Sequence, residues 1–355
     1  MMEKIRIGLI GVGGMAQSHI KGLQNVGTFQ IDAICDSNNK NLKKVGERLA
    51  IKSENQYIDF RKLIDSQKVD AVVSITPNNV HAPILEYCIE KNMPILTEKP
   101  LTLDYEEAKQ LAEKYKQQPI LCMVGFSYRY TPAFRFVKAL LDKGEIGQIR
   151  NFSIQYLQGW GALPYDTPYV WRFNPAATGT GVLGDLGSHM IDMAHYLFGS
   201  FQEVSAKMES FIKKRKMEQS NEWKEFVIDD FVCFQAKMES GIVGTFQTTR
   251  NAIGSGNQFD VSIYGDKGTI HASTMEEEIV NLIHFDDGTA ELVEKKMHVP
   301  KTVYLSEWED FAQMLMGQIG SGFPDFEVGL RNQQVLEAII QSSNQPGKMI
   351  DALEN

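Results

Sequence analysis

The stretch IRIGLIGVGGMA, residues 5–16, places a short β-rich run directly before three glycines and an alanine. A run that is apolar nearly throughout is typical of a strand that is buried on both faces. The pattern G-x-G-x-x-A at its end fits a tight turn that opens a helix. This stretch therefore predicts a strand, a glycine turn and a helix, which together begin a dinucleotide-binding unit.

The same alternation continues through the first third of the chain. Further apolar runs predict strands, and the segments between them carry apolar residues at helical spacing. A series of this kind predicts an α/β domain with a doubly wound parallel sheet, which we place at residues 1–124. The predicted strands are 5–10, 29–35, 70–76, 93–97 and 120–126, and the predicted helices are 15–26, 38–49, 80–91 and 105–116.

After residue 125 the pattern changes to longer strands with alternating polarity, separated by turn pairs such as GDKG at 265–268. This pattern predicts a second α+β domain, residues 125–355, with a large, mostly antiparallel open sheet. One face of such a sheet needs cover, which another subunit can supply. We expect the helical segment at about 325–342 to pack back on the first domain. The predicted strands are 149–156, 204–212, 228–238, 241–250 and 257–265, and the predicted helices include 131–143 and 183–198.

Composition narrows the class of protein. The chain has 355 residues, 43% of them hydrophobic and 23% charged, which is ordinary for a globular protein of two domains. A formal charge of −9 argues against a nucleic-acid binder, whose affinity would need a basic stripe. The one basic run, KKRK at 213–216, is followed by glutamates and is interpreted as a solvated hairpin loop.

The cysteines and the apolar runs bear on the location of the protein. Four cysteines occur without a C-x-x-C pair, which supports neither a disulfide framework nor a zinc knuckle and fits a reducing compartment. The first residues do not resemble a signal peptide, and no run of eighteen apolar residues occurs. We therefore expect a soluble, cytoplasmic protein with no membrane partner.

The glycine turn has the residues that a dinucleotide site needs. Gly11 permits the tight turn, Gly13 lets the backbone approach a pyrophosphate, and Ala16 allows close packing of helix on strand. Gly14 and Met15 complete the loop, whose amides would meet the phosphates at the positive end of the helix dipole.

Asp36, twenty residues beyond Ala16, ends the second predicted strand. There a carboxylate can accept hydrogen bonds from the ribose hydroxyls, and it would repel a 2′-phosphate. No arginine follows in Ser37, Asn38 and Asn39, so the sequence favours NAD over NADP as cofactor.

Two further segments end predicted strands at the carboxyl edge of the parallel sheet, where ligands bind in open α/β folds. They are Thr76-Pro77-Asn78 and Thr97-Glu98-Lys99-Pro100. Glu98 and Lys99 can point into a cofactor cleft, and the proline holds Lys99 extended. A surface salt bridge at a strand end is the alternative interpretation.

A helix of the second domain carries a matching polar set within GVLGDLGSHMIDMAHYLFG, residues 181–199. At 3.6 residues per turn, Asp185, His189 and Asp192 fall within about 60° of one another. A histidine held between carboxylates can take a proton from an alcohol near neutral pH. The alternative is a helix start capped by Asp185 with His189 in the core. His195 points away, and no H-E-x-x-H occurs, so we expect no metal site.

With these motifs, the chain resembles the Gfo/Idh/MocA family, the glucose-fructose oxidoreductase and inositol dehydrogenase group, over nearly its whole length. The motifs are the N-terminal G-x-G-x-x-A, EKP at 98–100, G-F-x-x-R-Y at 125–130, W-R at 171–172, D-x-x-x-H-x-x-D at 185–192, and DFEVGLRNQQVLEAI at 325–339.

The resemblance implies an NAD(P)-dependent dehydrogenase that acts on CH–OH groups of sugars, inositols or related polyols. It also implies a homo-oligomer, a dimer or tetramer, formed through the C-terminal sheet. Lys99, Asp185 and His189 match the family's catalytic set, and Asp192 matches a further polar position. Ser127 and Tyr128 stand where an inositol dehydrogenase can carry further basic residues, so the resemblance does not single out inositol.

The complete set of expected site residues follows from the motifs and the resemblance together. The expected cofactor-binding residues are Gly11, Gly13, Gly14, Met15, Ala16, Asp36, Thr76, Pro77, Asn78, His81, Glu98, Lys99 and Arg129. The expected substrate-binding residues are Lys99, Tyr128, Trp171, Arg172, Asp185 and His189. Two other functions stay open at this point: an NADPH-dependent reductase of keto-sugars or dicarbonyls, and a nicotinamide-binding regulator without catalysis.

Overall fold

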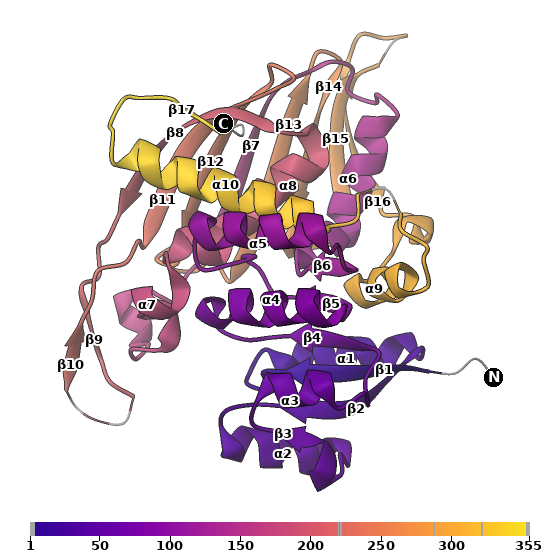
Figure 1. Ribbon diagram of the computed structural model, residues 1–355. Coiled ribbons are helices and arrows are strands. Elements are labelled where there is room, and N and C mark those ends of the chain that lie inside the picture. Colours follow the sequence, from indigo (N-terminus) through magenta and orange to yellow (C-terminus); the bar gives the residue numbers. More distant parts are fainter. Residues whose placement is uncertain (1–3, 219, 221, 287, 321, 353–355) are drawn as a thin grey trace. The chain divides into compact units, whose positions relative to one another are not determined.

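The computed structural model describes residues 4–218, 220, 222–286, 288–320 and 322–352. The chain forms two compact units (Figure 1). The first runs up to Phe126 and also includes Ser306–Leu330. The second comprises Ser127–Leu305 and the residues from Arg331 onward. The division lies two residues beyond the expected boundary at 124, and residues 306–330 return to the first unit.

The first unit contains a parallel sheet with helices, as the sequence predicts. Within the described residues its six strands lie in the order β3-β2-β1-β4-β5-β6. The strands are β1 (Ile5–Ile10), β2 (Phe29–Cys35), β3 (Gln56–Tyr57), β4 (Ala71–Ser74), β5 (Ile95–Thr97) and β6 (Cys122–Val124). The helices are α1 (Ala16–Val26), α2 (Asn39–Leu49), α3 (Phe60–Asp65), α4 (His81–Lys91) and α5 (Tyr105–Gln117). This arrangement confirms the predicted doubly wound fold.

The sequence prediction missed β3 and α3. β3 has two residues, both half-buried, so it shows neither an apolar run nor an alternation long enough to recognise. α3 is a helix of six residues that starts after the cap Asp59, whose carboxylate accepts a hydrogen bond from the Arg61 amide. Elements this short are held by their neighbours in the fold rather than by their own pattern.

Residues 306–330 supply two helical pieces to the first unit. α9 (Glu307–Leu315) begins at a capping box in which Ser306 and Glu309 exchange hydrogen bonds. Phe311 of α9 stacks on Phe29 with the ring centroids 5.8 Å apart. Phe326, the first residue of α10 (Phe326–Ser343), stacks on Tyr115 with the centroids 4.1 Å apart. Aromatic burial therefore ties this distant segment to the first sheet domain.

The second unit is built on a nine-stranded, mostly antiparallel sheet, counted over the described residues, which confirms the predicted α+β class. Its order is β16-β15-β14-β13-β7-β12-β11-β8-β17, and β7 and β12 pair in parallel. The strands are β7 (Ile149–Gln158), β8 (Phe201–Glu209), β11 (Phe231–Met238), β12 (Val243–Thr249), β13 (Asn257–Gly265), β14 (Gly268–Ser273), β15 (Ile279–Phe285), β16 (Leu292–His298) and β17 (Ile350–Asp351).

Helices cover one face of this sheet and form its core (Figure 1). They are α6 (Pro132–Asp142), α8 (Ser188–Phe198) and the part of α10 from Arg331. Their apolar side chains pack with those of β7, β11 and β13, and Phe152 and Phe198 stack at 4.0 Å. A short helix, α7 (Pro175–Thr178), precedes α8. None of the described helices is both long and apolar enough to cross a membrane.

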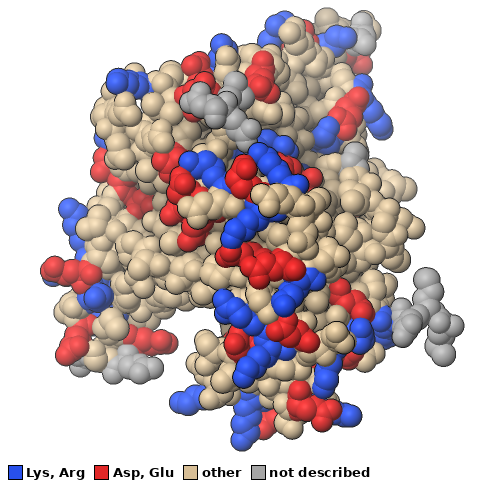
Figure 2. Space-filling view, in the orientation of Figure 1, with Lys and Arg blue, Asp and Glu red and all other residues tan. Residues whose placement is uncertain are grey.

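The basic run at 213–216 is only partly what the sequence predicts. It does form a hairpin, in which β9 (Lys214–Lys216) pairs with β10 (Trp223–Glu225). Arg215, however, is 3% exposed, and its guanidinium donates to the carbonyl oxygens of Thr167 and Gly161. The interpretation as a wholly solvated loop is therefore wrong at Arg215, because alternate strand residues face opposite sides. On the face shown in Figure 2, basic and acidic side chains are interspersed.

Candidate functional site

The glycine turn between β1 and α1 has the geometry that the motif predicts. Gly11 has φ of 86°, and a Cβ built on it would lie 2.3 Å from the Ile75 carbonyl oxygen, so a side chain does not fit there. At Gly13 and Gly14 no described atom lies within 4 Å of such a Cβ, which leaves open space beside the loop. Ala16 is fully buried, while Met15 is exposed. The fold requires Gly11, and the open space is where a pyrophosphate would approach.

The first turn of α1 carries no acidic side chain of its own. All of α1 is described, and it has no acidic residue in its first turn and no side-chain cap. Helix amides at such an end, together with the helix dipole, favour a phosphate.

Asp36 lies beside this loop. Its Oδ2 accepts a hydrogen bond from the Val12 amide at 2.9 Å, and its Oδ1 accepts one from the Asn38 amide at 2.7 Å. These bonds orient the carboxylate without using all of its acceptor sites. The carboxylate can therefore still accept hydrogen bonds from the hydroxyls of a ribose.

The segments after β4 and β5 are held together by His81. This residue is fully buried, with Nδ1 at 2.8 Å from the Pro100 carbonyl oxygen and Nε2 at 3.0 Å from that of Thr76. Burial lowers the pKa of His81, although both carbonyls oppose the shift. Asn78 begins a short 3-10 turn after Pro77 and is also buried. His81 thus fixes the two loops from within, rather than presenting its ring to solvent.

Glu98, which directly follows the buried strand β5, is satisfied within the first unit. Its Oε1 lies 2.9 Å from Nε2 of His19 in α1, and its Oε2 accepts the Lys99 amide at 3.2 Å. The indole N–H of Trp308 donates to Nδ1 of His19 at 3.4 Å. The peptide bond between Lys99 and Pro100 is cis. A buried strand can end in this charged pair because a histidine from another element receives the carboxylate.

A second carboxylate, Glu307 at the start of α9, is 4% exposed. A Cβ on Gly125 would lie 3.4 Å from Oε1 of both Glu98 and Glu307, so both carboxylates face this glycine. Burial raises the pKa of Glu307 to about 7; His19 opposes the rise and Glu98 adds to it. For His19, burial lowers the pKa, but the hydrogen bond and charge of Glu98 and the charge of Glu307 outweigh burial and raise it. We call His19, Glu98 and Glu307 the buried acid cluster.

In the second unit, Asp185 lies in a π-helical turn, Leu183–Gly187, that runs into α8. Its Oδ2 is 2.8 Å from Nη2 of Arg250 and 3.8 Å from Nε of Arg172. The predicted angle between Asp185 and His189 assumes a regular α-helix, and the π turn departs from it. Turns of this kind occur often at functional sites.

Asp192 does not share one open row with Asp185 and His189. Its two carboxylate oxygens accept hydrogen bonds from the Arg129 guanidinium at 2.6 and 2.7 Å. Asp192 is 2% exposed and Arg129 is 4% exposed. The predicted carboxylate–imidazole–carboxylate row is therefore wrong at Asp192, because a buried guanidinium needs a counter-charge. Arg129, which we expected at the cofactor, is held in this ion pair.

His189 lies against aromatic rings. Its ring contacts that of Tyr128 edge-on, with the ring centroids 4.8 Å apart. The centroid of the Tyr156 ring is 6.2 Å from that of His189. The two tyrosine hydroxyls are 2.6 Å apart, and Asn257 bonds to both. The Tyr128 ring thus packs against His189, while its hydroxyl bonds to Tyr156 and Asn257.

Trp171 and Arg172 form a short 3-10 turn. The Arg172 guanidinium lies over the Trp171 ring, 4.6 Å from the centroid, and the indole is 39% exposed. Among the expected substrate residues of the second unit, Arg172 and Asp185 are therefore placed together, and so are Tyr128 and His189.

Comparisons with known proteins agree with this geometry. Residues 5–126 match the model of an oxidoreductase family with an NAD-binding Rossmann fold, and residues 134–271 match the GFO/IDH/MocA C-terminal domain. Levoglucosan dehydrogenase of Pseudarthrobacter phenanthrenivorans is 33% identical over 76% of this chain and 73% of that protein. The chain belongs to the Gfo/Idh/MocA oxidoreductase family.

Two further comparisons cover most of this Gfo/Idh/MocA chain. A solved levoglucosan dehydrogenase in complex with NADH and levoglucosan superposes with a TM-score of 0.91 at 28% identity, covering 99% of this chain and 100% of that one. The NAD-dependent scyllo-inositol 2-dehydrogenase of Bacillus subtilis is 24% identical over 88% of this chain and 86% of that protein. The predicted oxidoreductase activity and the predicted NAD cofactor are thereby confirmed.

Sequence reasoning missed several residues of the Gfo/Idh/MocA oxidoreductase that surround the expected ones. They are His19, Glu307 and Trp308 around Glu98, and Arg250 beside Asp185. Arg250 ends the apparent strand 241–250 and gave no motif. His19 follows Ala16 by three residues, which places both on the same face of the first helix. This spacing was the one sequence signal that could have placed His19 near the glycine turn.

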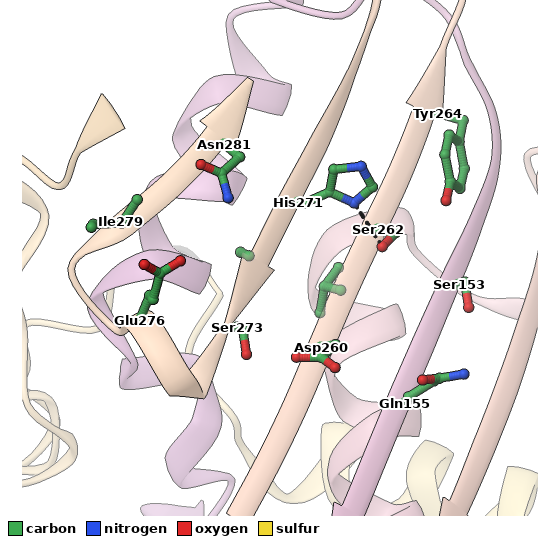
Figure 3. A pocket seen from close by; sticks show the side chains of 12 residues that line it. Ser153, Gln155, Asp260, Ser262, Tyr264, His271, Ser273, Glu276, Ile279 and Asn281 are labelled. Atoms are coloured by element: carbon green, nitrogen blue, oxygen red, sulfur yellow. Dashed lines mark hydrogen bonds between the residues drawn. The ribbon is translucent and has the colours of Figure 1, made fainter. Parts of the chain in front are cut away.

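A separate hollow of about 330 Å³ lies on the sheet of the second unit, on β7, β13, β14 and β15 (Figure 3). Its lining is mostly polar and includes Ser153, Asp260 and Asn281. Nδ1 of His271 lies 2.8 Å from the Ser262 hydroxyl, the dashed contact in Figure 3. No residue that we expected at the active site lines this hollow. The hollow therefore lies on the face of the second sheet that the helices of this unit leave uncovered.

Proposed function

We propose that this NAD-dependent oxidoreductase transfers a hydride between the nicotinamide and a secondary alcohol or ketone of a sugar, inositol or related polyol. The observation that carries the substrate class is the match to levoglucosan and inositol dehydrogenases over most of their length. The exposed Trp171 ring suits this class, because an aromatic face packs on the apolar C–H face of a sugar ring.

We propose Lys99, Asp185 and His189 as the catalytic set. His189 accepts the proton of the reacting hydroxyl, and the Lys99 ammonium stabilises the negative charge that develops on that oxygen. Asp185, an anion beside Arg250, accepts hydrogen bonds and orients the reacting groups. NAD supplies the hydride acceptor when it is bound at the glycine turn. In the reverse direction the same groups reduce a ketone.

The geometry of each unit supports these roles. Glu98 holds the Lys99 backbone amide, which fixes the start of that side chain. The edge contact with Tyr128 restricts the ring of His189. Groups that are positioned before the reaction lose less entropy when it occurs.

The test is a screen of levoglucosan, inositols, glucose 6-phosphate and free sugars for NADH formation, followed by Lys99→Met and His189→Gln on the best substrate. Each variant should keep NAD affinity and lose about 10² to 10⁴ in kcat, the range for proton-transfer groups. Lys44→Met, an exposed lysine of α2, is the matched control and should keep full activity. Near-normal kcat in both site variants would refute the assignment.

We also infer a cytoplasmic homo-oligomer, a dimer or tetramer that pairs through the open face of the second sheet. The polar hollow lined by Asp260, Ser262 and Asn281 lies on that face, and the described cysteines are free thiols. Light scattering after gel filtration should give a multiple of 40.0 kDa. Ser262→Arg should lower that mass, and a monomer in the unsubstituted protein would refute the inference.

A further inference from the structure

Arg250 heads the fully buried side chains of the protein when these are ranked by size. It follows β12 directly and is 1% exposed. Burying a guanidinium is costly unless a counter-charge and hydrogen bonds receive it. The counter-charge is Asp185, whose Oδ2 lies 2.8 Å from Nη2 of Arg250. The free-energy cost of burying this guanidinium is therefore offset in part by its ion pair with one carboxylate, that of Asp185.

Arg250 also joins the segments around that carboxylate. Its Nη2 donates to the Gly181 carbonyl at 3.0 Å, at the end of the loop that leads into the π turn. Its Nη1 donates to the Arg172 carbonyl at 3.4 Å. The guanidinium lies over the ring of Trp160, 5.1 Å from the centroid. A single side chain therefore sets where Asp185 lies relative to the loops at 160 and 172.

We propose that Arg250 is a positioning residue that fixes Asp185 as an ionised, oriented hydrogen-bond acceptor for the substrate, a role that rests on the proposed function of Asp185. The guanidinium is present at every working pH, since arginine does not lose its proton in proteins. Its charge at 2.8 Å favours the ionised carboxylate over the neutral acid. Asp185 then accepts hydrogen bonds and does not donate a proton in the reaction.

Other charged and titratable groups face this pair from neighbouring elements. Arg172 lies 3.8 Å from Asp185, and the charge of Asp185 adds to the upward shifts in the pKa of Tyr128 and Tyr156, which burial dominates. On the other side, the Asp229 carboxylate accepts hydrogen bonds from the amides of Gly181 and Leu183. Burial raises the pKa of Asp229, and the charge of Arg250 opposes that rise. Arg172 is the more exposed of the two arginines and makes the longer contact, so Arg250 contributes more than Arg172 to the field at Asp185.

The experiment measures kcat/KM against pH for the wild type, Arg250→Met and Arg250→Lys, with NAD affinity and thermal unfolding as parallel measurements. In the wild type the acidic limb reports the general base His189, so the comparison is made in the His189→Gln background. There Arg250→Met should move the remaining acidic limb to higher pH, because the ionised Asp185 loses its counter-charge. Arg250→Lys should move the acidic limb less than Arg250→Met does, because lysine keeps a positive charge at this position. NAD affinity should not change.

The matched control is Arg215→Met. Arg215 is buried nearby, lies over the Phe173 ring at 4.2 Å and bonds to carbonyl oxygens rather than to Asp185. This variant also loses a buried guanidinium but leaves Asp185 paired with Arg250, so the acidic limb should stay in place. An acidic limb that moves equally in both variants, or in neither, would overturn the proposal.

A double variant keeps the test informative if Arg250→Met is unstable. If Arg250 acts through Asp185, Arg250→Met combined with Asp185→Asn should be no slower than Asp185→Asn alone. Additive losses would overturn the proposal for Arg250. Full turnover in Asp185→Asn by itself would instead overturn the proposed role of Asp185, so the two failures are distinguishable.

Discussion

Replacing Glu307 by glutamine should remove a pH-dependent loss of stability from the first unit. Glutamine has nearly the same shape as a protonated glutamic acid and cannot ionise. Glu307 is 4% exposed, and its Oε1 is buried without a hydrogen-bond partner among the described residues. Ionising the carboxyl in that position costs free energy, because burial removes its hydration and the charge of His19 replaces it only in part.

The magnitude follows from the pKa of Glu307, which burial raises from 4.5 to about 7. At about 1.4 kcal/mol per unit, the shift corresponds to about 3 kcal/mol. Between these two values the folded protein binds the proton more tightly than the unfolded chain does, so stability falls as pH rises. The loss is absent below about pH 4.5 and complete above about pH 7. Glu307→Gln should therefore gain about 3 kcal/mol on the wild type between pH 4.5 and pH 8.

The assay is urea denaturation at pH 4.5, 6 and 8, followed by hydrogen exchange of peptides from α1 and α9, which report on the first unit alone. The control is Glu90→Gln, an exposed glutamate of α4, whose difference from the wild type should be the same at each pH. His19 also has a raised pKa, so its contribution to stability is lost as pH rises. The charge of Glu307 is one cause of that shift, so Glu307→Gln also lowers the pKa of His19, whereas Glu90→Gln leaves the contacts of His19 in place. A constant difference between Glu307→Gln and the wild type would refute a protonated Glu307 in the folded state.

Three further outcomes are expected. Gly11→Ala should abolish NAD binding in a titration and lower the unfolding free energy by about 1–3 kcal/mol, because a Cβ would lie 2.3 Å from the Ile75 carbonyl at φ of 86°; normal NAD affinity would contradict this. Asp36→Ser should raise NADP affinity relative to NAD by tenfold or more in the same titration, since it removes the repulsion of a 2′-phosphate; an unchanged ratio would show that Asp36 does not discriminate. Arg129→Met should cost about 3–5 kcal/mol in urea denaturation by leaving Asp192 buried and unpaired, whereas replacing both residues by apolar ones should cost less; a single variant as stable as the wild type would rule out this ion pair as a structural element.

The sequence by itself determined the features that depend on neighbouring residues. The strand, glycine turn and helix of residues 5–26 lie where the pattern predicts, because apolar runs and a positive φ at Gly11 are local properties. Five strands of the second sheet, β7, β8, β11, β12 and β13, were predictable for the same reason, since alternation along a strand fixes which side chains face the core. The sequence prediction did not include β14, β15, β16 and β17. β3 was too short to carry such a signal.

Only the tertiary structure decided which charges meet. Glu98 and His19 are 79 residues apart, Asp185 and Arg250 are 65 apart, and Arg129 and Asp192 are 63 apart. A charged side chain must find a counter-charge wherever it is buried, and folding brings that partner from any part of the chain. Local patterns report which face of an element is buried, but they do not report what lies across from it. For that reason the sequence named Glu98, Asp185 and Asp192 as candidate residues, and the fold supplied their partners.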